Sequence, residues 1–215
     1  MDQLLTDADV RVLGALIEKE ITTPDHYPLS LNALTAACNQ TTNRHPVVSF
    51  DEATVLEAIQ HLRHQSLVRG IQRMDSRVTK YEHLATEALS LSSREMAVMC
   101  VLLLRGAQTL GELRTRTERL AQSETLGDVE ATITALTERA PPFVTRLARQ
   151  AGQKEVRYAH LLSGEIPADV PEVHAPAAAE PRVDRLGAIE ETTHQLRAEL
   201  AELQRQFAEF RKQFE

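Results

Sequence analysis

The sequence predicts a mainly α-helical fold with small β-hairpins, an α+β class, and three observations support this prediction. Apolar residues recur at spacings of three and four along most of the chain, which is typical of amphipathic helices. Short β-prone segments around glycine-containing turns follow the helices twice, with the same order of elements each time. A proline-rich stretch then separates these two copies from a C-terminal run of heptads.

Composition limits the class of protein. Of the 215 residues, 42% are apolar and only 4% aromatic, so we expect small aliphatic cores. No apolar run approaches the ~20 residues of a membrane span, and we see no signal peptide. Cys38 and Cys100 each lie in an apolar helical pattern. We therefore expect two reduced, buried thiols in a cytoplasmic protein that does not contact a membrane.

The net charge of −7 is unevenly distributed. Residues 1–84 carry 8 basic and 11 acidic side chains, a net charge of −3. Residues 85–163 carry 10 and 9, a net charge of +1, and residues 164–215 carry 6 and 11, a net charge of −5. This acidity argues against indiscriminate binding of polyanions but permits local basic patches.

The first copy is expected to occupy residues 1–85. Thr6 and Asp9 have the spacing of a capping box at a helix start, and Ser30 can cap a short second helix. The predicted elements are a helix to about Glu20, a helix over Ser30–Cys38, a helix from about Asp51 to Ser66, and a hairpin formed by residues 67–70 and 78–81.

The second copy, residues 86–163, repeats this order. Ser92 and Glu95 repeat the capping box, and a second helix begins at Thr109. A third helix and a hairpin turning at Gly152 follow. Three helices and a two-stranded hairpin are the plan of a winged helix, in which the second and third helices form a helix-turn-helix. The alternative is a generic small α+β domain.

Residues 164–181 contain four prolines and little apolar bulk, which indicates a linker. Residues 182–215 carry apolar side chains at heptad spacing and predict a coiled-coil-like helix. We expect this helix to meet a partner helix in a homodimer, in parallel or antiparallel pairing. The alternative is a single amphipathic helix that lies on its own globular part.

Several blocks of the sequence resemble the YceH family of bacterial proteins. They are LIEKE at 16–20, TTPD at 22–25, YPLSLNAL at 27–34, CNQ at 38–40, TNR at 42–44, VTKYEH at 78–83, LRGAQT at 104–109 and GELRTR at 111–116. The resemblance covers residues 4–164. It implies tandem winged-helix domains and no enzyme activity, and it provides no known ligand because the family is uncharacterised. His45 departs from the acidic residue expected before the proline.

Winged helices most often bind DNA through the third helix and the hairpin. The candidate contacts are Gln60, Arg63 and His64 on the third helix, Arg69, Arg73, Arg77 and Lys80 on the first hairpin, and Arg146, Arg149, Lys154 and Arg157 on the second. Arg114, Arg116 and Arg119 add positive charge to the short helix of the second copy. The alternative is that these hairpin cations only prevent edge-to-edge pairing of strands.

The third helices of both copies are acidic, which argues against groove reading. In the first, three carboxylates face Arg63, and in the second, three face Arg139. If DNA is bound, we expect the first copy and the hairpins to bind it, while the second copy packs against a partner.

The polar segment after the second helix is a candidate functional loop, because the second copy replaces it with a shorter connection. Its candidate residues are Asn39, Gln40, Thr42, Asn43 and Arg44. A requirement of the fold alone would apply to both copies. The alternative is that these side chains cap helices and satisfy loop amides.

We find no catalytic constellation, and we expect no cofactor or metal. His61 and His64 are three residues apart but lack a third ligand nearby. Two hypotheses remain. The first is a homodimeric protein that binds double-stranded DNA, as transcription regulators do. The second is a protein-interaction scaffold like the tandem winged helices of chromosome-organising assemblies.

Overall fold

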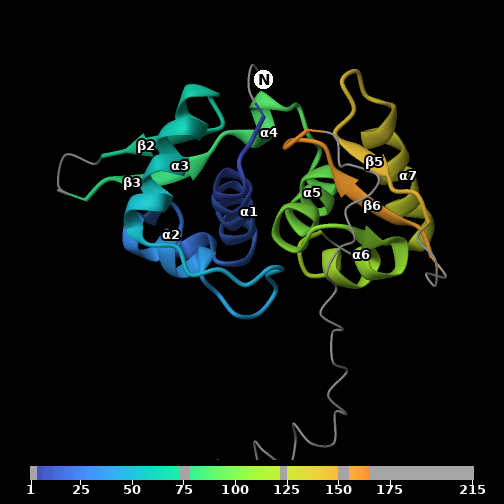
Figure 1. Cartoon of the computed structure of the whole chain (residues 1–215), viewed down its shortest axis with the longest axis horizontal. Helices are drawn as coiled ribbons and strands as arrows, with labels where there is room; N and C mark the ends of the chain where they lie inside the picture. The colour runs from blue at the N-terminus through green and yellow to red at the C-terminus, as the bar shows by residue number, and fades with distance from the viewer. Residues whose placement is uncertain (1–3, 73–77, 122–124, 150–154, 165–215) are drawn as a thin grey trace, which may run out of the picture. The chain divides into compact units, whose positions relative to one another are not determined.

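The computed structural model describes residues 4–72, 78–121, 125–149 and 155–164. All of them belong to one compact unit, residues 1–168. Helices alternate with small antiparallel sheets in this unit, a mixed α+β fold (Figure 1). Arg73, Arg77, Lys154, the predicted linker from residue 165 onward and the predicted heptad helix lie outside the described residues.

The first half runs from α1 to β3. Its elements are α1 (Asp7–Thr22), η1 (Pro24–His26), β1 (Leu29–Ser30), α2 (Leu31–Cys38), α3 (Glu52–His64), β2 (Val68–Ile71) and β3 (Lys80–His83). The capping box of Thr6 and Asp9 is confirmed, and Ser30 caps α2 as predicted. Helix α3 ends two residues before the predicted Ser66, because Ser66 adopts a left-handed backbone with φ 59°.

The second half runs from α5 to β6 and follows a short helix, α4 (Ala85–Ala88). Its elements are α5 (Ser93–Arg105), β4 (Gln108–Thr109), α6 (Leu110–Thr117), α7 (Leu126–Glu138), β5 (Val144–Arg146) and β6 (Arg157–His160). Helices α5, α6 and α7 each begin with a capping box. Three helices and then a hairpin therefore occur in both halves, in the order predicted from the sequence.

Each sheet has three strands instead of the two expected. In the first sheet β3 is central and pairs with β2 and with β1, where Leu29 faces Tyr81. In the second sheet β6 is central and pairs with β5 and β4. The sequence analysis missed β1 and β4 because each has two residues and leads directly into a helix, too short for any periodicity.

The two halves share one hydrophobic core, in which α1 packs against α5 (Figure 1). Residues 96–104 of α5 are all buried, so this helix is apolar on every side, as a central helix must be. Gly14 permits the close approach, since a Cβ there would lie 2.9 Å from Leu104 Cδ2 and 3.1 Å from Leu103 Cβ. Strand β3 packs against α1 and β6 against α5, which places the sheets on opposite sides of the helix pair.

Candidate nucleic-acid interface

Arg44, the charged residue of the predicted functional loop, is buried against α1. Its Nη2 and Nη1 atoms donate to the two carboxylate oxygens of Glu18 at 2.7 and 3.2 Å. Its Nε and Nη2 atoms also donate to the carbonyl of Ala37. The Arg44 side chain has no exposed surface. This guanidinium therefore attaches the loop to α1 and is not presented to a ligand.

Other side chains of the loop also make internal contacts. Asn39 pairs twice with the backbone of Phe50, at 2.7 and 2.8 Å. Gln40 Oε1 accepts a hydrogen bond from Arg44, and Asn43 Oδ1 accepts one from Arg105 at the end of α5. These contacts correspond to the capping alternative left open by the sequence. Thr42 is exposed.

The loop also connects the two halves of the unit. The backbone N–H of His45 donates to the carbonyl of Leu104, and Arg105 donates to Asn43. A loop that joins the first half to the second is needed only once. This explains, without a ligand, why the second half has a shorter connection at the equivalent place.

The first-half candidates lie on α3 and the first sheet. Gln60, Arg63 and His64 are exposed on α3, and Lys80 is exposed on β3. Arg69 forms an ion pair with Glu82, which faces it across the two strands. Its charge is thus partly compensated within the sheet.

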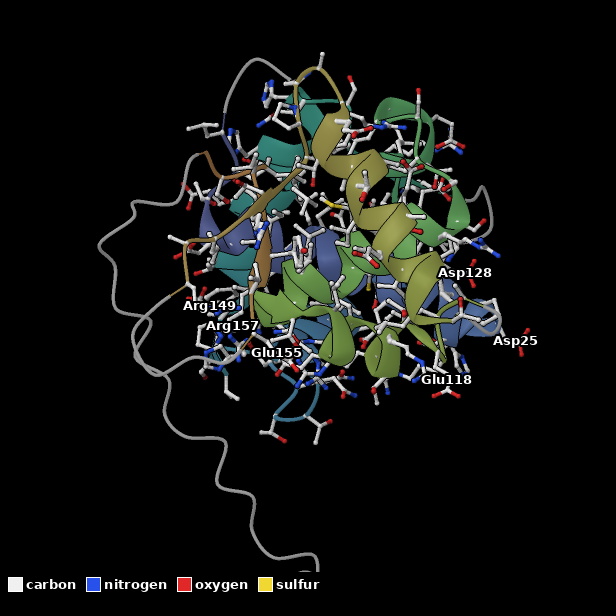
Figure 2. All side chains as sticks on the ribbon, turned by 90° about the vertical axis from the view of Figure 1, so that its right-hand side faces the viewer. Asp25, Glu118, Asp128, Arg149, Glu155 and Arg157 are labelled. Atoms are coloured by element: carbon white, nitrogen blue, oxygen red, sulfur yellow. The ribbon has the colours of Figure 1, made fainter. Side chains whose placement is uncertain are left out.

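The described second-half candidates lie on or just beyond the strands β5 and β6. Arg146 and Arg149 are exposed. Arg157 Nη1 lies 3.0 Å from Glu112 Oε2 and 2.8 Å from the carbonyl of Ala107. Figure 2 shows Arg149 and Arg157 toward one edge of the unit, whereas Glu118 and Asp128 lie toward the other edge in this view.

The structure does not bring the two hairpins together. Because one sheet packs against α1 and the other against α5, strands β2 and β3 lie on a different side of the unit from strands β5 and β6 (Figure 1). The two hairpins therefore do not share one surface that could contact a DNA duplex.

The packing instead gathers basic side chains where α6 meets α1 and the end of α5. We define the seam cluster as six cations around two carboxylates: Lys19, Arg44, Arg105, Arg116, Arg119 and Arg157 with Glu18 and Glu112. Six positive and two negative charges give a net charge of +4. The sequence analysis noted the arginines of α6, but nothing local in the sequence joins them to Arg105 and Glu18.

The seam cluster carries an excess of positive charge. The pKa of Arg105 is lowered to about 10, mainly by burial and in addition by the neighbouring charges of Arg116 and Arg119. Arg119 Nη2 lies 3.8 Å from Glu18 Oε1, and Arg116 Nη2 lies 3.6 Å from Glu112 Oε1. Such an arrangement favours the approach of an anion.

The residues that the structure describes contain neither a cluster of metal ligands nor a helix that could span a membrane. Within it, no group of three His, Cys, Asp or Glu side chains is placed to hold a metal ion. None of the helices among these residues has the length and apolar character needed to cross a bilayer.

Residues 5–153 match the family described as a protein of unknown function, DUF480. The chain belongs to the DUF480 family. Among similar proteins, the UPF0502 proteins of Pelobacter propionicus and Solibacter usitatus are 50% and 51% identical over 220 and 218 residues. That of Geobacter sulfurreducens is 48% identical over 221 residues, and all three alignments cover both chains completely. The description of the DUF480 family assigns it no activity.

Proposed function

We propose that this DUF480 protein is a non-enzymatic, homodimeric protein that is built from two winged-helix modules and binds double-stranded DNA mainly through the basic region around the seam cluster. The order of three helices and a hairpin in each half supports the winged-helix assignment. The two-residue strands β1 and β4 complete each sheet before the second helix of each module. The heptads of residues 182–215 support the homodimer.

The observation that carries the DNA proposal is the concentration of positive charge on one region of an acidic chain. The seam cluster has a net charge of +4, whereas the chain has −7. Arg114 is exposed on α6, two residues before Arg116, and exposed Arg149 lies toward the same edge as Arg157 and Glu155 in Figure 2. Arginines that contact phosphates release counterions, which drives binding to the DNA backbone.

This proposal places the main contact on the second half, which differs from the expectation at the sequence level. The reason is that the packing of α1 against α5 and of α5 against α6 brings Glu18 within 3.8 Å of Arg119 and Arg105 near Arg116 and Arg119. The exposed side of α7 carries Glu130, Ala131, Thr134 and Glu138, which suit base reading poorly. We therefore expect binding that is dominated by phosphate contacts and has little sequence preference.

Fluorescence anisotropy with a long labelled duplex, over a series of salt concentrations, tests the proposal. Arg114→Gln combined with Arg149→Gln removes two exposed cations, so we expect the slope of log affinity against log salt to become shallower by about 2. Arg63→Gln on α3 is the matched control and should change the affinity little. Absence of binding in low salt, or equal losses for both variants, contradicts the proposal.

A protein-interaction scaffold is the second candidate. The exposed surfaces of α3 and α7 carry Glu52, Glu57, Glu130 and Glu138, so a basic protein would be a suitable partner. Affinity purification after nuclease treatment tests this candidate. A partner that is recovered with the wild-type chain and lost with Glu130→Lys/Glu138→Lys supports it, and recovery that depends on intact DNA contradicts it.

A further inference from the structure

We propose that the seam cluster is a binding site for a phosphoryl oxyanion, which Arg105, Arg116 and Arg119 bind together. This inference deepens the proposed function, because the phosphoryl group can belong to a DNA backbone. It can also belong to a free phosphorylated small molecule, so the tests below separate the two sources.

Three of the four carboxylate oxygens of the cluster accept hydrogen bonds from structural partners. Both oxygens of Glu18 accept hydrogen bonds from Arg44, at 3.2 and 2.7 Å. Glu112 Oε2 accepts from the backbone of Thr109 at 2.9 Å and from Arg157 at 3.0 Å. These three oxygens stabilise the fold, and Glu112 Oε1 is the remaining carboxylate oxygen of the cluster, 3.6 Å from Arg116 Nη2.

Arg116 and Arg119 have only long contacts to these carboxylates. The separations of 3.6 and 3.8 Å exceed the length of a charge-assisted hydrogen bond. A guanidinium has five N–H donors in a planar fork, which matches the oxygens of a phosphoryl group. Both side chains therefore have donors to offer an incoming anion.

The guanidinium groups of Arg116 and Arg119 are accessible from solvent. The side chains of Arg116 and Arg119 are 29% and 52% exposed, whereas that of Arg44 is fully buried. A ligand can thus reach the outer arginines from solvent. Arg105 is partly buried and is oriented by its hydrogen bond to Asn43. Reduced solvation at Arg105 strengthens its attraction to a bound anion.

The charge of the cluster selects the kind of anion. Three neighbouring guanidinium groups repel one another, and this repulsion adds to the effect of burial in lowering the pKa of Arg105. A phosphoryl group has three or more acceptor oxygens and can contact all three arginines at once, whereas a carboxylate has only two oxygens. We therefore expect pyrophosphate to bind better than acetate.

Thermal unfolding of the full chain in the presence of pyrophosphate, at constant ionic strength adjusted with chloride, tests the inference. A ligand that binds the folded state raises Tm with a saturating dependence on concentration. We expect such a rise for wild type and at least a tenfold weaker apparent affinity for Arg116→Gln/Arg119→Gln. Arg63→Gln/Arg146→Gln, which removes two arginines outside the cluster, should behave as wild type.

Equal responses of wild type and the seam variant to pyrophosphate, or equal responses to pyrophosphate and acetate, overturn the inference. Because the ion pairs of Arg116 and Arg119 with described residues are long, the seam variant should keep the circular dichroism and the Tm of wild type without ligand. If it does not, Arg116→Lys/Arg119→Lys retains the charge and should restore Tm while still weakening pyrophosphate binding.

Competition with labelled duplex DNA separates the two sources of the phosphoryl group. If pyrophosphate displaces DNA and the seam variant binds DNA at least tenfold more weakly, the site binds the DNA backbone. If pyrophosphate binds but DNA does not bind at all, the inference stands for a small phosphorylated ligand and the proposed function fails. If DNA binds and pyrophosphate does not, the inference fails and the proposed function stands.

Discussion

The guanidinium of Arg44 and the carboxylate of Glu18 form a buried ion pair with hydrogen bonds of 2.7 and 3.2 Å. This pair joins the loop after α2 to the last two turns of α1. The carbonyls of Ala37 and Asn43 accept the other donors of Arg44, so the buried charge is well satisfied.

Glu18→Gln should strongly destabilise the protein, because it leaves the buried Arg44 charge without its counterion. We expect the free energy of unfolding in urea to fall by about 3–5 kcal/mol. Replacing both residues, as Glu18→Leu/Arg44→Leu, should be less harmful than the sum of the two single changes. Glu57→Gln, on the exposed side of α3, is the control, and an effect of Glu18→Gln as small as that of the control contradicts this role.

Gly14→Leu should separate or distort the pairing of α1 with α5. Even a Cβ at this position would lie 2.9 Å from Leu104 Cδ2, and Leu103 Cβ is 3.1 Å away. Overpacking of this kind destabilises a core by about 1–3 kcal/mol, measurable as a lower urea midpoint. Gly111→Ala on α6 is the control for a glycine with free space around it, since a Cβ added there would lie 4.0 Å from the nearest atom, Thr109 Oγ1. It should raise stability by about 0.5–1 kcal/mol, and a similar rise for Gly14→Leu would show that the two helices are not closely packed.

His160 should make stability depend on pH. Burial lowers its pKa to about 4, while the charge of Asp7 opposes this effect. As pH falls from about 6.5 to 4, the unfolded chain gains a proton that the folded chain does not, so the free energy of unfolding decreases. The loss should reach about 3 kcal/mol at pH 4.

Urea unfolding at a series of pH values measures this dependence. His160→Gln should flatten the difference between neutral and acidic pH, whereas His64→Gln, at an exposed position, should leave it unchanged. Parallel pH profiles for wild type and His160→Gln would rule out this role of His160.

Cys38 and Cys100 should be unreactive in the folded protein. Both are buried and free, and burial raises the pKa of Cys38 to about 12 and raises the pKa of Cys100 as well. A thiol reagent at mildly alkaline pH should react only as the chain unfolds, because the thiolate is the nucleophile. Labelling rates should follow urea unfolding, and rapid labelling of either thiol in native protein would contradict this burial.

Local signals in the sequence predicted the helix starts correctly. The capping boxes at Thr6 and Ser92 each depend on a residue three positions away, so the information lies within one turn. The order of helices and hairpins and the burial of both cysteines follow from periodicity in the same way. Strands β1 and β4 escaped prediction because two residues form no pattern.

By itself, the sequence determined the three main helices and the hairpin of each half, and that two similar halves follow one another. Only the tertiary structure decided where the charges meet. Arg44 pairs with Glu18, 26 residues away, and Arg119 approaches the same carboxylate because α1 packs against α5. Helical periodicity shows that a helix has an apolar side but not which other helix covers it, so the partners of these arginines could not be predicted.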